Sequence, residues 1–362
     1  MKITTIDLFC GIGGLTHGLM LAGLDVVAGF DIDPTCQYAY EINNNAVFIA
    51  ADISTIPATD ISKHYNDSDI KVLVGCAPCQ PFSKYTMRYR KNGKGGVAHF
   101  DNNSKNHNKW GLVESFAEKI HQILPDIVSM ENVPELVNTN VFKSFLSTLR
   151  KYNYYVSYCV AFCPDYGVPQ NRKRLVLLAS RLGEISLIEP QYTPDKYINV
   201  KAAIGKLPKL KAGEKHADDM LHFCAMLNSI NMKRIKASKQ GGTWREWDES
   251  LQLKCHKKNS GKTYRSVYGR MSWGLPSPTI TTQFYGYGNG RFGHPEQDRA
   301  ISWREGALLQ SFPPDYVFID PTKEINRRVI GTHIGNAVPV ELGRAIGLSI
   351  KNHIKEVIGN ER

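Results

Sequence analysis

The stretch from Thr4 to Leu15 reads T-T-I-D-L-F-C-G-I-G-G-L and predicts the fold of the first part of the chain. Its first residues alternate and then run apolar, as in a buried β-strand, and the residues up to Leu24 carry apolar side chains at helical spacing. A strand, a glycine turn and a helix in this order are typical of a nucleotide-type cofactor site, because glycines let the ligand approach the backbone. The third glycine of the dinucleotide fingerprint is absent, since Thr16 stands in its place.

Acidic residues follow at the ends of the next two predicted strands. The second strand, Asp25–Phe30, leads into Asp31, about 20 positions after the glycine turn, where a carboxylate binds ribose hydroxyls. Asp33 precedes a proline and is expected to cap the next helix. Asp52 follows a short third strand and either bonds the adenine amino group or serves as a turn aspartate.

A stiff loop carries the predicted nucleophile. The apolar strand Ile70–Gly75 continues into G-C-A-P-C-Q-P-F-S, which ends at Ser83, and two prolines make this segment leave the strand. Cys79 lies at its centre, and loops at strand ends are where α/β proteins place chemistry. The basic, glycine-rich stretch that follows is expected to meet a phosphate backbone and to close over the substrate. Its cations include Lys84, Arg88 and Arg90.

Two further charged residues are predicted at the same edge of the sheet. Glu131 follows the apolar strand Asp126–Met130, and Arg172 lies in a turn before another strand. Because loops at one edge of a parallel sheet meet, we expect Cys79, Glu131 and Arg172 to gather there. A thiolate, an acid and a cation form a coherent set for covalent catalysis on an electron-poor ring. A nearby arginine also lowers the pKa of a thiol.

Strands alternate with helices up to about residue 190, which predicts an α/β fold with a mostly parallel, doubly wound sheet. Residues 191–332 are basic and aromatic and show no such alternation, so we expect a smaller second domain that contacts a polyanion. A C-terminal helix, Glu341–Ile358, is predicted to pack back on the first domain. The expected division is therefore 1–190, completed by 333–362, and 191–332.

Composition limits the classes of partner. The chain has 362 residues, a net charge of +11 and a pI of about 9.1, and this excess of positive charge favours nucleic acid as partner. No apolar run approaches the roughly 18 residues of a membrane helix. The chain also opens directly on a strand pattern rather than a signal peptide. We expect a cytoplasmic protein without membrane contact.

The cysteines leave one alternative open. The chain has eight, and in the cytoplasm they are expected to be reduced. Cys76 and Cys79 have C-x-x-C spacing, and Cys159 and Cys163 have C-x-x-x-C spacing. A zinc site made of these four sulfurs is therefore an alternative to catalysis by Cys79. Our main prediction includes no metal.

These motifs, taken together and in order, resemble the DNA cytosine-5 methyltransferase family. The resemblance covers nearly the whole chain except about Tyr192–Arg265. The matching segments are D-L-F-C-G-I-G-G at Asp7–Gly14, P-C-Q-P-F-S at Pro78–Ser83, E-N-V at Glu131–Val133, Q-N-R-K-R at Gln170–Arg174, the stretch Arg299–Pro313 and G-N-A-V-P at Gly335–Pro339. The resemblance implies the S-adenosylmethionine-dependent methyltransferase fold, with a target-recognition domain and hinge at 191–332.

The resemblance also implies the reaction. Cys79 would add to C6 of a cytosine flipped out of duplex DNA, and C5 would then take the methyl group of S-adenosylmethionine. Glu131 would bond N3 and the 4-amino group, and Arg172 would hold the base and Glu131. Arg174 belongs to the same motif and is included among the catalytic residues. The loop Ser83–Asp101 would close over the base.

The resemblance assigns further residues by motif. The cofactor would be bound by Phe9, Gly11, Gly13, Gly14, Asp31, Ile32, Asp52, Ile53, Pro78, Asn336 and Val338. DNA would be contacted by Ser83, Lys84, Arg88, Arg90, Gln170, Arg245, Arg265 and Tyr285. An aromatic residue in the second domain is as readily part of its core as a DNA contact. Cys10 and Cys76 receive no role.

Three readings therefore remain at the level of sequence. The first is a monomeric, sequence-specific DNA methyltransferase of the restriction-modification type, functionally paired with a restriction endonuclease. The second is a tRNA cytosine methyltransferase on the same scaffold, which the sizeable basic second domain disfavours. The third is a non-catalytic DNA-binding or zinc protein, which the presence of all three catalytic residue types disfavours.

Overall fold

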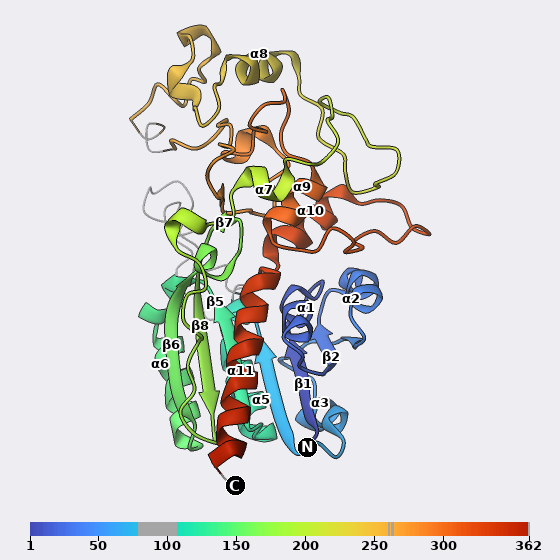
Figure 1. Ribbon diagram of the computed structural model, residues 1–362, viewed down its shortest axis with the longest axis vertical. Helices are drawn as coiled ribbons and strands as arrows, with labels where there is room; N and C mark the ends of the chain where they lie inside the picture. The colour runs from blue at the N-terminus through green and yellow to red at the C-terminus, as the bar shows by residue number, and fades with distance from the viewer. Residues whose placement is uncertain (79–106, 260, 262–263, 361–362) are drawn as a thin grey trace. The chain divides into compact units, whose positions relative to one another are not determined.

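The computed structural model describes residues 1–78, 107–259, 261 and 264–360, and Figure 1 traces them. Contacts divide the chain into two compact units. Unit 1 comprises Met1–Phe162, Lys173–Glu189 and Val340–Arg362, and unit 2 comprises Cys163–Arg172 and Pro190–Pro339.

Unit 1 is built on a seven-stranded sheet in the order β3-β2-β1-β4-β5-β8-β6. The strands are β1 (Ile3–Leu8), β2 (Val26–Asp31), β3 (Val47–Ala50), β4 (Ile70–Gly75), β5 (Ile127–Asn132), β6 (Tyr155–Phe162) and β8 (Lys173–Ser180). Every pair from β3 to β5 is parallel, whereas β8 runs antiparallel to both β5 and β6. The prediction of a mostly parallel sheet in an α/β fold is therefore confirmed.

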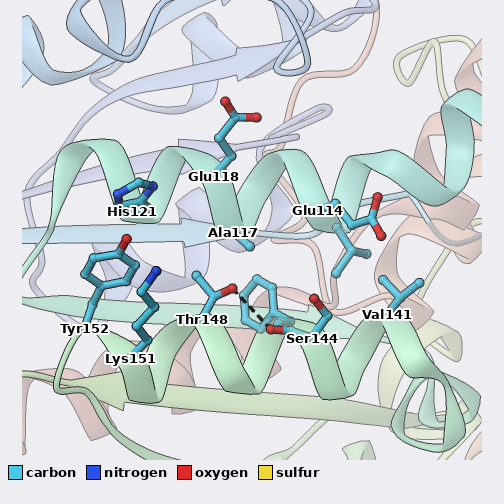
Figure 2. A pocket seen from close by; sticks show the side chains of 11 residues that line it. Glu114, Ala117, Glu118, His121, Val141, Ser144, Thr148, Lys151 and Tyr152 are labelled. Atoms are coloured by element: carbon cyan, nitrogen blue, oxygen red, sulfur yellow. Dashed lines mark hydrogen bonds between the residues drawn. The ribbon is translucent and has the colours of Figure 1, made fainter.

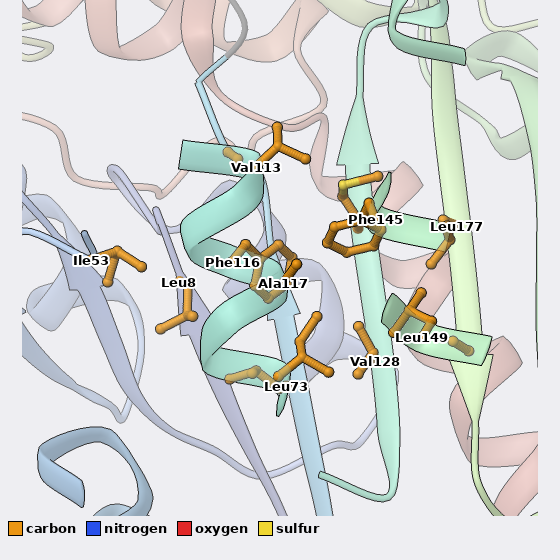
Figure 3. Close-up of a cluster of buried hydrophobic side chains, with 14 of the residues drawn as sticks. Leu8, Ile53, Leu73, Val113, Phe116, Ala117, Val128, Phe145, Leu149 and Leu177 are labelled. Atoms are coloured by element: carbon orange, nitrogen blue, oxygen red, sulfur yellow. The ribbon is translucent and has the colours of Figure 1, made fainter. Parts of the chain in front are cut away.

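Helices cover both faces of this sheet (Figure 1). They are α1 (Gly14–Leu21), α2 (Gln37–Asn43), α3 (Ala58–Ser62), α5 (His107–Ile123), α6 (Asn140–Lys151) and α11 (Val340–Asn360). Figure 3 shows the core between the sheet and α5 and α6, where Phe116 and Phe145 meet Leu73 and Val128. All four side chains are nearly or fully buried, and their burial provides the main hydrophobic stabilisation of this layer.

Glycines allow α1 and α11 to approach each other closely. A Cβ on Gly18 of α1 would lie 2.3 Å from the carbonyl oxygen of Val340, and one on Gly343 of α11 would lie 3.0 Å from that of Leu15. Only glycine fits the first position, because no real Cβ comes so near a backbone oxygen. The C-terminal helix thus packs on the first α/β unit, as its apolar spacing predicted.

Unit 2 has little regular structure among its described residues. It contains the two-residue parallel strands β7 (Gln170–Asn171) and β9 (Ser277–Pro278), and the helices α7 (Val200–Ile204), α8 (Ser229–Ala237), α9 (Trp303–Leu309) and α10 (Arg327–Asn336). The expected absence of strand–helix alternation is confirmed. The helices were not predicted, although S-W-R-E at 302–305 is a capping-box sequence and forms one at α9.

The surface of unit 1 has a hollow of about 300 Å³ between α5 and α6 (Figure 2). It is lined by polar side chains such as Glu114, Glu118 and Lys151, and His121 stacks on Tyr152 at its side. None of the residues predicted for catalysis, cofactor or DNA lines it. Within the part of the chain that the structure describes, no helix is long and apolar enough to span a membrane.

Candidate active site

The carboxyl ends of the parallel strands meet at one edge of the sheet in unit 1, and most predicted site residues of this unit lie there. β1 ends before Phe9, β2 ends at Asp31, and β4 leads into Cys76. Glu131 and Asn132 close β5. Ligand sites of open α/β sheets form at this edge, so these side chains lie where such sheets usually bind ligands.

The glycine turn after β1 has the backbone conformation that its sequence predicts. Gly11 has a φ of +52° and Gly13 a φ of +85°, which are left-handed values that favour glycine. Phe9 also has a positive φ, of +59°, which is uncommon for a non-glycine residue and typical of functional loops. A Cβ on Gly11 would meet nothing within 4 Å, so space lies open beside this turn.

Asp31 ties the glycine turn to the end of β2. One carboxylate oxygen accepts a hydrogen bond from the Gly11 N–H at 2.9 Å, and the other accepts from the Asp33 N–H at 2.9 Å. Ile32, between the two aspartates, is 67% exposed. Asp33 accepts from the Thr35 N–H and caps the short helical turn before α2, which confirms its predicted role.

Glu131 is a buried carboxylate at this edge. It is 2% exposed, and its Oε1 lies 2.8 Å from Nε of Arg174 in an ion pair. The antiparallel direction of β8 explains the pair, because Leu175 at the start of β8 stands opposite Asn132 at the end of β5. The residue before Leu175 therefore reaches the strand end that carries Glu131.

The segment before the predicted nucleophile is fastened to the same strand end. Sγ of Cys76 lies 2.8 Å from Oε2 of Glu131, and Nδ2 of Asn132 donates to the carbonyl oxygen of Ala77 at 3.1 Å. Sequence analysis assigns no role to Cys76. Its place directly after β4, the strand next to β5, was the available signal, since neighbouring parallel strands end side by side.

Two buried ionisable residues lie beneath the glycine turn. Asp7 is fully buried, burial raises its pKa to about 7, and its Oδ2 accepts a hydrogen bond from the Thr16 hydroxyl at 2.7 Å. Burial also raises the pKa of the Cys10 thiol well above its usual value, with the negative charges of Asp7 and Asp31 adding to the effect. Cys10 is thus a neutral core residue.

Other residues predicted for the cofactor differ in accessibility. Pro78 is exposed and Gly14 is buried at the start of α1. Asp52 forms a turn, because its Oδ1 accepts from both the N–H and the hydroxyl of Ser54. Ile53 is 2% exposed and its side chain belongs to the core in Figure 3, so its predicted contact with adenine has no exposed side-chain surface to use.

In unit 2, Gln170 and Arg172 are buried, and both side chains form hydrogen bonds with the backbone of Ile280. Gln170 is 0% exposed, donates to the Leu309 carbonyl and accepts from the Ile280 N–H. Direct contact of its side chain with DNA would require this arrangement to open. Arg172 is 5% exposed and donates to the carbonyl oxygen of Ile280 at 3.1 Å. Its role at the base stays a prediction.

The remaining predicted residues of unit 2 differ in exposure. Asn336 is exposed at the end of α10, whereas Val338 is buried. Arg265 is exposed, and so is Arg245, whose guanidinium lies 5.7 Å from the ring of Trp244. Tyr285 is half-buried and stacks on Trp303 with the ring centroids 4.3 Å apart.

Several aromatic residues of unit 2 form its core. Trp244, Trp247 and Tyr287 are each at most 5% exposed and pack together with Ile235 and Ala300. The alternative that aromatics here are core residues therefore holds for these three. Five other predicted residues lie outside the described part of the chain. They are Cys79, Ser83, Lys84, Arg88 and Arg90.

The strand order argues against a zinc site shared by the cysteines. Cys76 follows β4 and Cys159 lies in the edge strand β6, with β5 and β8 between them. Strands are spaced by about 4.8 Å, so three spacings separate these residues by roughly 14 Å. Sulfurs that share a zinc ion bind at about 2.3 Å from the metal, which this separation does not allow.

Residues 3–352 match the family described as C-5 cytosine-specific DNA methylase. The chain belongs to this family. It is 49% identical over 360 residues to the Type II methylase M.HgiDII of Herpetosiphon aurantiacus, covering 99% of this chain and 97% of that protein. It is also 32% identical to the Type II methyltransferase M1.HphI of Haemophilus parahaemolyticus, covering 97% of this chain and 87% of that protein.

Solved structures show the same methyltransferase fold. A prophage-encoded DNA modification methyltransferase from E. coli superposes with a TM-score of 0.74 at 20% identity, covering 98% of this chain and all of the other. The S. pombe Dnmt2 methyltransferase gives a TM-score of 0.59 at 17% identity, covering 97% of this chain and 99% of the other. The fold prediction and the family resemblance are both confirmed.

Membership of this family makes the protein a DNA cytosine-5 methyltransferase with S-adenosylmethionine as its methyl donor. The turn after β1 fits such a cofactor. Space lies open beside Gly11, Asp31 holds a carboxylate at the end of β2, and the exposed Ile32 offers an apolar surface next to it. The half-buried Asp31 carboxylate is placed as a ribose-binding acid is in related α/β folds.

Proposed function

We propose that this protein methylates C5 of a flipped-out cytosine in duplex DNA through a covalent adduct of Cys79, with Glu131 as the acid that binds the base. The single observation that supports the residue roles is the placement of Glu131. It is a buried carboxylate held by Arg174 at the strand end beside the segment that leads to Cys79. A buried carboxylate with an ordered cation is prepared to bind a polar ring edge.

The proposed steps follow from these residues. The Cys79 thiolate forms a bond to C6 while Glu131, protonated when the base binds, gives its proton to N3 and accepts a hydrogen bond from the 4-amino group. The proton neutralises the negative charge that develops at N3, and it returns to Glu131 when the ring is restored. S-adenosylmethionine, when bound, supplies the electrophilic methyl group that C5 accepts. Loss of the C5 proton to a base and cleavage of the bond between C6 and sulfur then restore the aromatic ring. Arg174 keeps the Glu131 carboxylate oriented throughout.

Unit 2 is proposed as the target-recognition domain. Its exposed lysines include Lys206, Lys209, Lys211, Lys233, Lys236, Lys239, Lys254, Lys257 and Lys258. Such a set neutralises backbone phosphates and makes binding sensitive to salt. Exposed Arg245 and Arg265 are the candidates for base contacts, since bidentate arginine contacts read guanine. The division of the chain at residues 190 and 333 into a catalytic domain and a target-recognition domain is part of this proposal.

The relatives are named as Type II methylases and methyltransferases, which supports a restriction-modification role. The protein would then protect host DNA from a paired endonuclease, acting as a monomer in the cytoplasm. Analytical sedimentation of the purified protein measures its mass in solution and so tests the prediction that it is a monomer.

Transfer of a labelled methyl group to duplex DNA and to tRNA tests the function itself. We expect label in duplex DNA alone, within a short sequence that mapping of 5-methylcytosine in the expression host identifies. Label in tRNA alone would contradict this proposal and would identify the protein as a tRNA cytosine methyltransferase. A Cys79→Ala variant provides the control, because it should bind DNA without transferring the methyl group.

A further inference from the structure

The carboxylate of Glu131 has a partner on each of its oxygens. Oε1 lies 2.8 Å from Nε of Arg174, and Oε2 lies 2.8 Å from Sγ of Cys76. Glu131 is only 2% exposed, so water reaches it poorly, and a buried carboxylate without donors is costly. The thiol therefore donates the hydrogen bond to Oε2, whereas Oε1 faces the positive charge of Arg174 in an ion pair.

The backbone around Cys76 fixes this contact in place. The Cys76 N–H donates to the carbonyl oxygen of Leu8 at 3.3 Å, and the next carbonyl, that of Ala77, accepts from Asn132. The chain is thus tied to β1 on one side and to β5 on the other. Cys76 is half-buried at the sheet edge, and this fixed backbone directs its Sγ toward Glu131.

We infer that Cys76 is a positioning residue, whose thiol holds Oε2 of Glu131 until the 4-amino group of the target cytosine replaces it. The inference rests on the proposed function of Glu131. A thiol is a weak hydrogen-bond donor, weaker than a hydroxyl or an amide N–H. It can therefore orient the carboxylate in the empty site and still yield the oxygen to the N–H of a base.

Three variants separate this role from simple packing. Cys76→Ala removes the donor, Cys76→Ser replaces it with a stronger one, and Cys159→Ala is a matched control on the exposed part of β6. Methyl transfer to duplex DNA gives kcat and KM, and thermal melting checks that each variant is folded.

We expect different effects from the two Cys76 variants. In Cys76→Ala the carboxylate loses a donor that holds it in place, so kcat falls about tenfold. In Cys76→Ser kcat is retained, whereas KM for DNA rises roughly fivefold because the hydroxyl competes better with the base. Cys159→Ala should match the wild type in both.

A spectroscopic readout tests the contact without turnover. The S–H stretching band of Cys76, isolated as the Raman difference between wild type and Cys76→Ser, should lie at a hydrogen-bonded frequency. It should shift toward that of a free thiol in Glu131→Ala and when substrate duplex binds the wild type.

The outcomes separate the inference from the function on which it rests. If folded Cys76→Ala keeps the wild-type kcat, the positioning role is wrong. A Raman band that Glu131→Ala leaves unmoved would overturn it as well. If the wild-type protein transfers no methyl group to DNA, the proposed function fails instead, and the band still shows whether the thiol donates to Glu131.

Discussion

The guanidinium of Arg174 and the carboxylate of Glu131 form an ion pair at 2.8 Å, with the two side chains 15% and 3% exposed. The pair joins the start of an antiparallel strand to the end of a parallel one. It brings a fixed positive charge to the acid that is proposed to bind cytosine, and burial strengthens the interaction relative to a pair in water.

Loss of this pair should impair catalysis more than cofactor binding. In Arg174→Ala the buried Glu131 carboxylate loses its cation, so we expect kcat to fall roughly a hundredfold, as when one preorganised stabilising group is removed. Affinity for S-adenosylmethionine should change less than threefold or so, because the glycine turn is untouched. Steady-state kinetics and calorimetry measure the two. Arg150→Ala, on the exposed face of α6, is the control, and an equal loss in both variants would contradict the assignment.

The Asp31 carboxylate should matter for cofactor binding through both of its oxygens. Asp31→Asn keeps the size of the side chain but turns one acceptor into a donor facing either Gly11 or Asp33. We expect affinity for S-adenosylmethionine to fall by about tenfold or more. Titration calorimetry checks this against Asp25→Asn, whose side chain is exposed directly before the start of β2. Unchanged affinity would remove Asp31 from the cofactor site.

Asp7 should make the protein less stable as pH rises toward neutrality. Burial raises its pKa from 3.8 to about 7, so the folded state holds a proton that the unfolded state releases above pH 3.8. Stability is therefore lost between about pH 4 and pH 7, by roughly 4 kcal/mol at most. Asp7→Asn does not titrate, so chemical denaturation should show its stability rising relative to wild type across this range. A constant difference between the two proteins would refute the protonated Asp7.

His294 should have the opposite effect in unit 2. Burial, aided by Arg299 and Arg270 and opposed by Glu305, lowers its pKa to about 4. The unfolded histidine binds a proton below about pH 6.5 and the folded one does not, so stability falls as pH drops from 6.5 to 4, by roughly 3 kcal/mol. His294→Gln should reduce this acid sensitivity in thermal melts of the full chain. Equal sensitivity in both proteins would contradict the neutral His294.

Sequence reasoning located the strand ends well, because parallel strands of an α/β fold share one functional edge. Asp31 and Glu131 follow from that rule alone. The pair between Arg174 and Glu131 does not follow from it. The apolar sequence of β8 does not indicate whether this strand runs parallel or antiparallel to β5. Motif matching likewise cannot tell a contacting side chain from a buried one, as Ile53 and Gln170 show.

The second unit was harder to anticipate for a different reason. Its helices are short or polar, so apolar periodicity is weak, and α8 buries only Arg234 and Ile235. The core instead comes from Trp244 and Trp247 packed with Tyr287, which follows 40 residues later in the sequence. Composition therefore predicted a basic, aromatic domain but not how its aromatics divide between core and surface.

The central claim is that the sulfur of Cys79 adds to C6 of cytosine before C5 is methylated. Duplex DNA in which every cytosine is replaced by 5-fluorocytosine tests it most directly, because fluorine at C5 cannot leave as the proton does. With S-adenosylmethionine present, the wild-type protein should become joined to this DNA through Cys79, and peptide mapping by mass spectrometry should locate the adduct. Cys79→Ala should give no adduct. Absence of a crosslink in wild-type protein that methylates the unsubstituted duplex would contradict the covalent account.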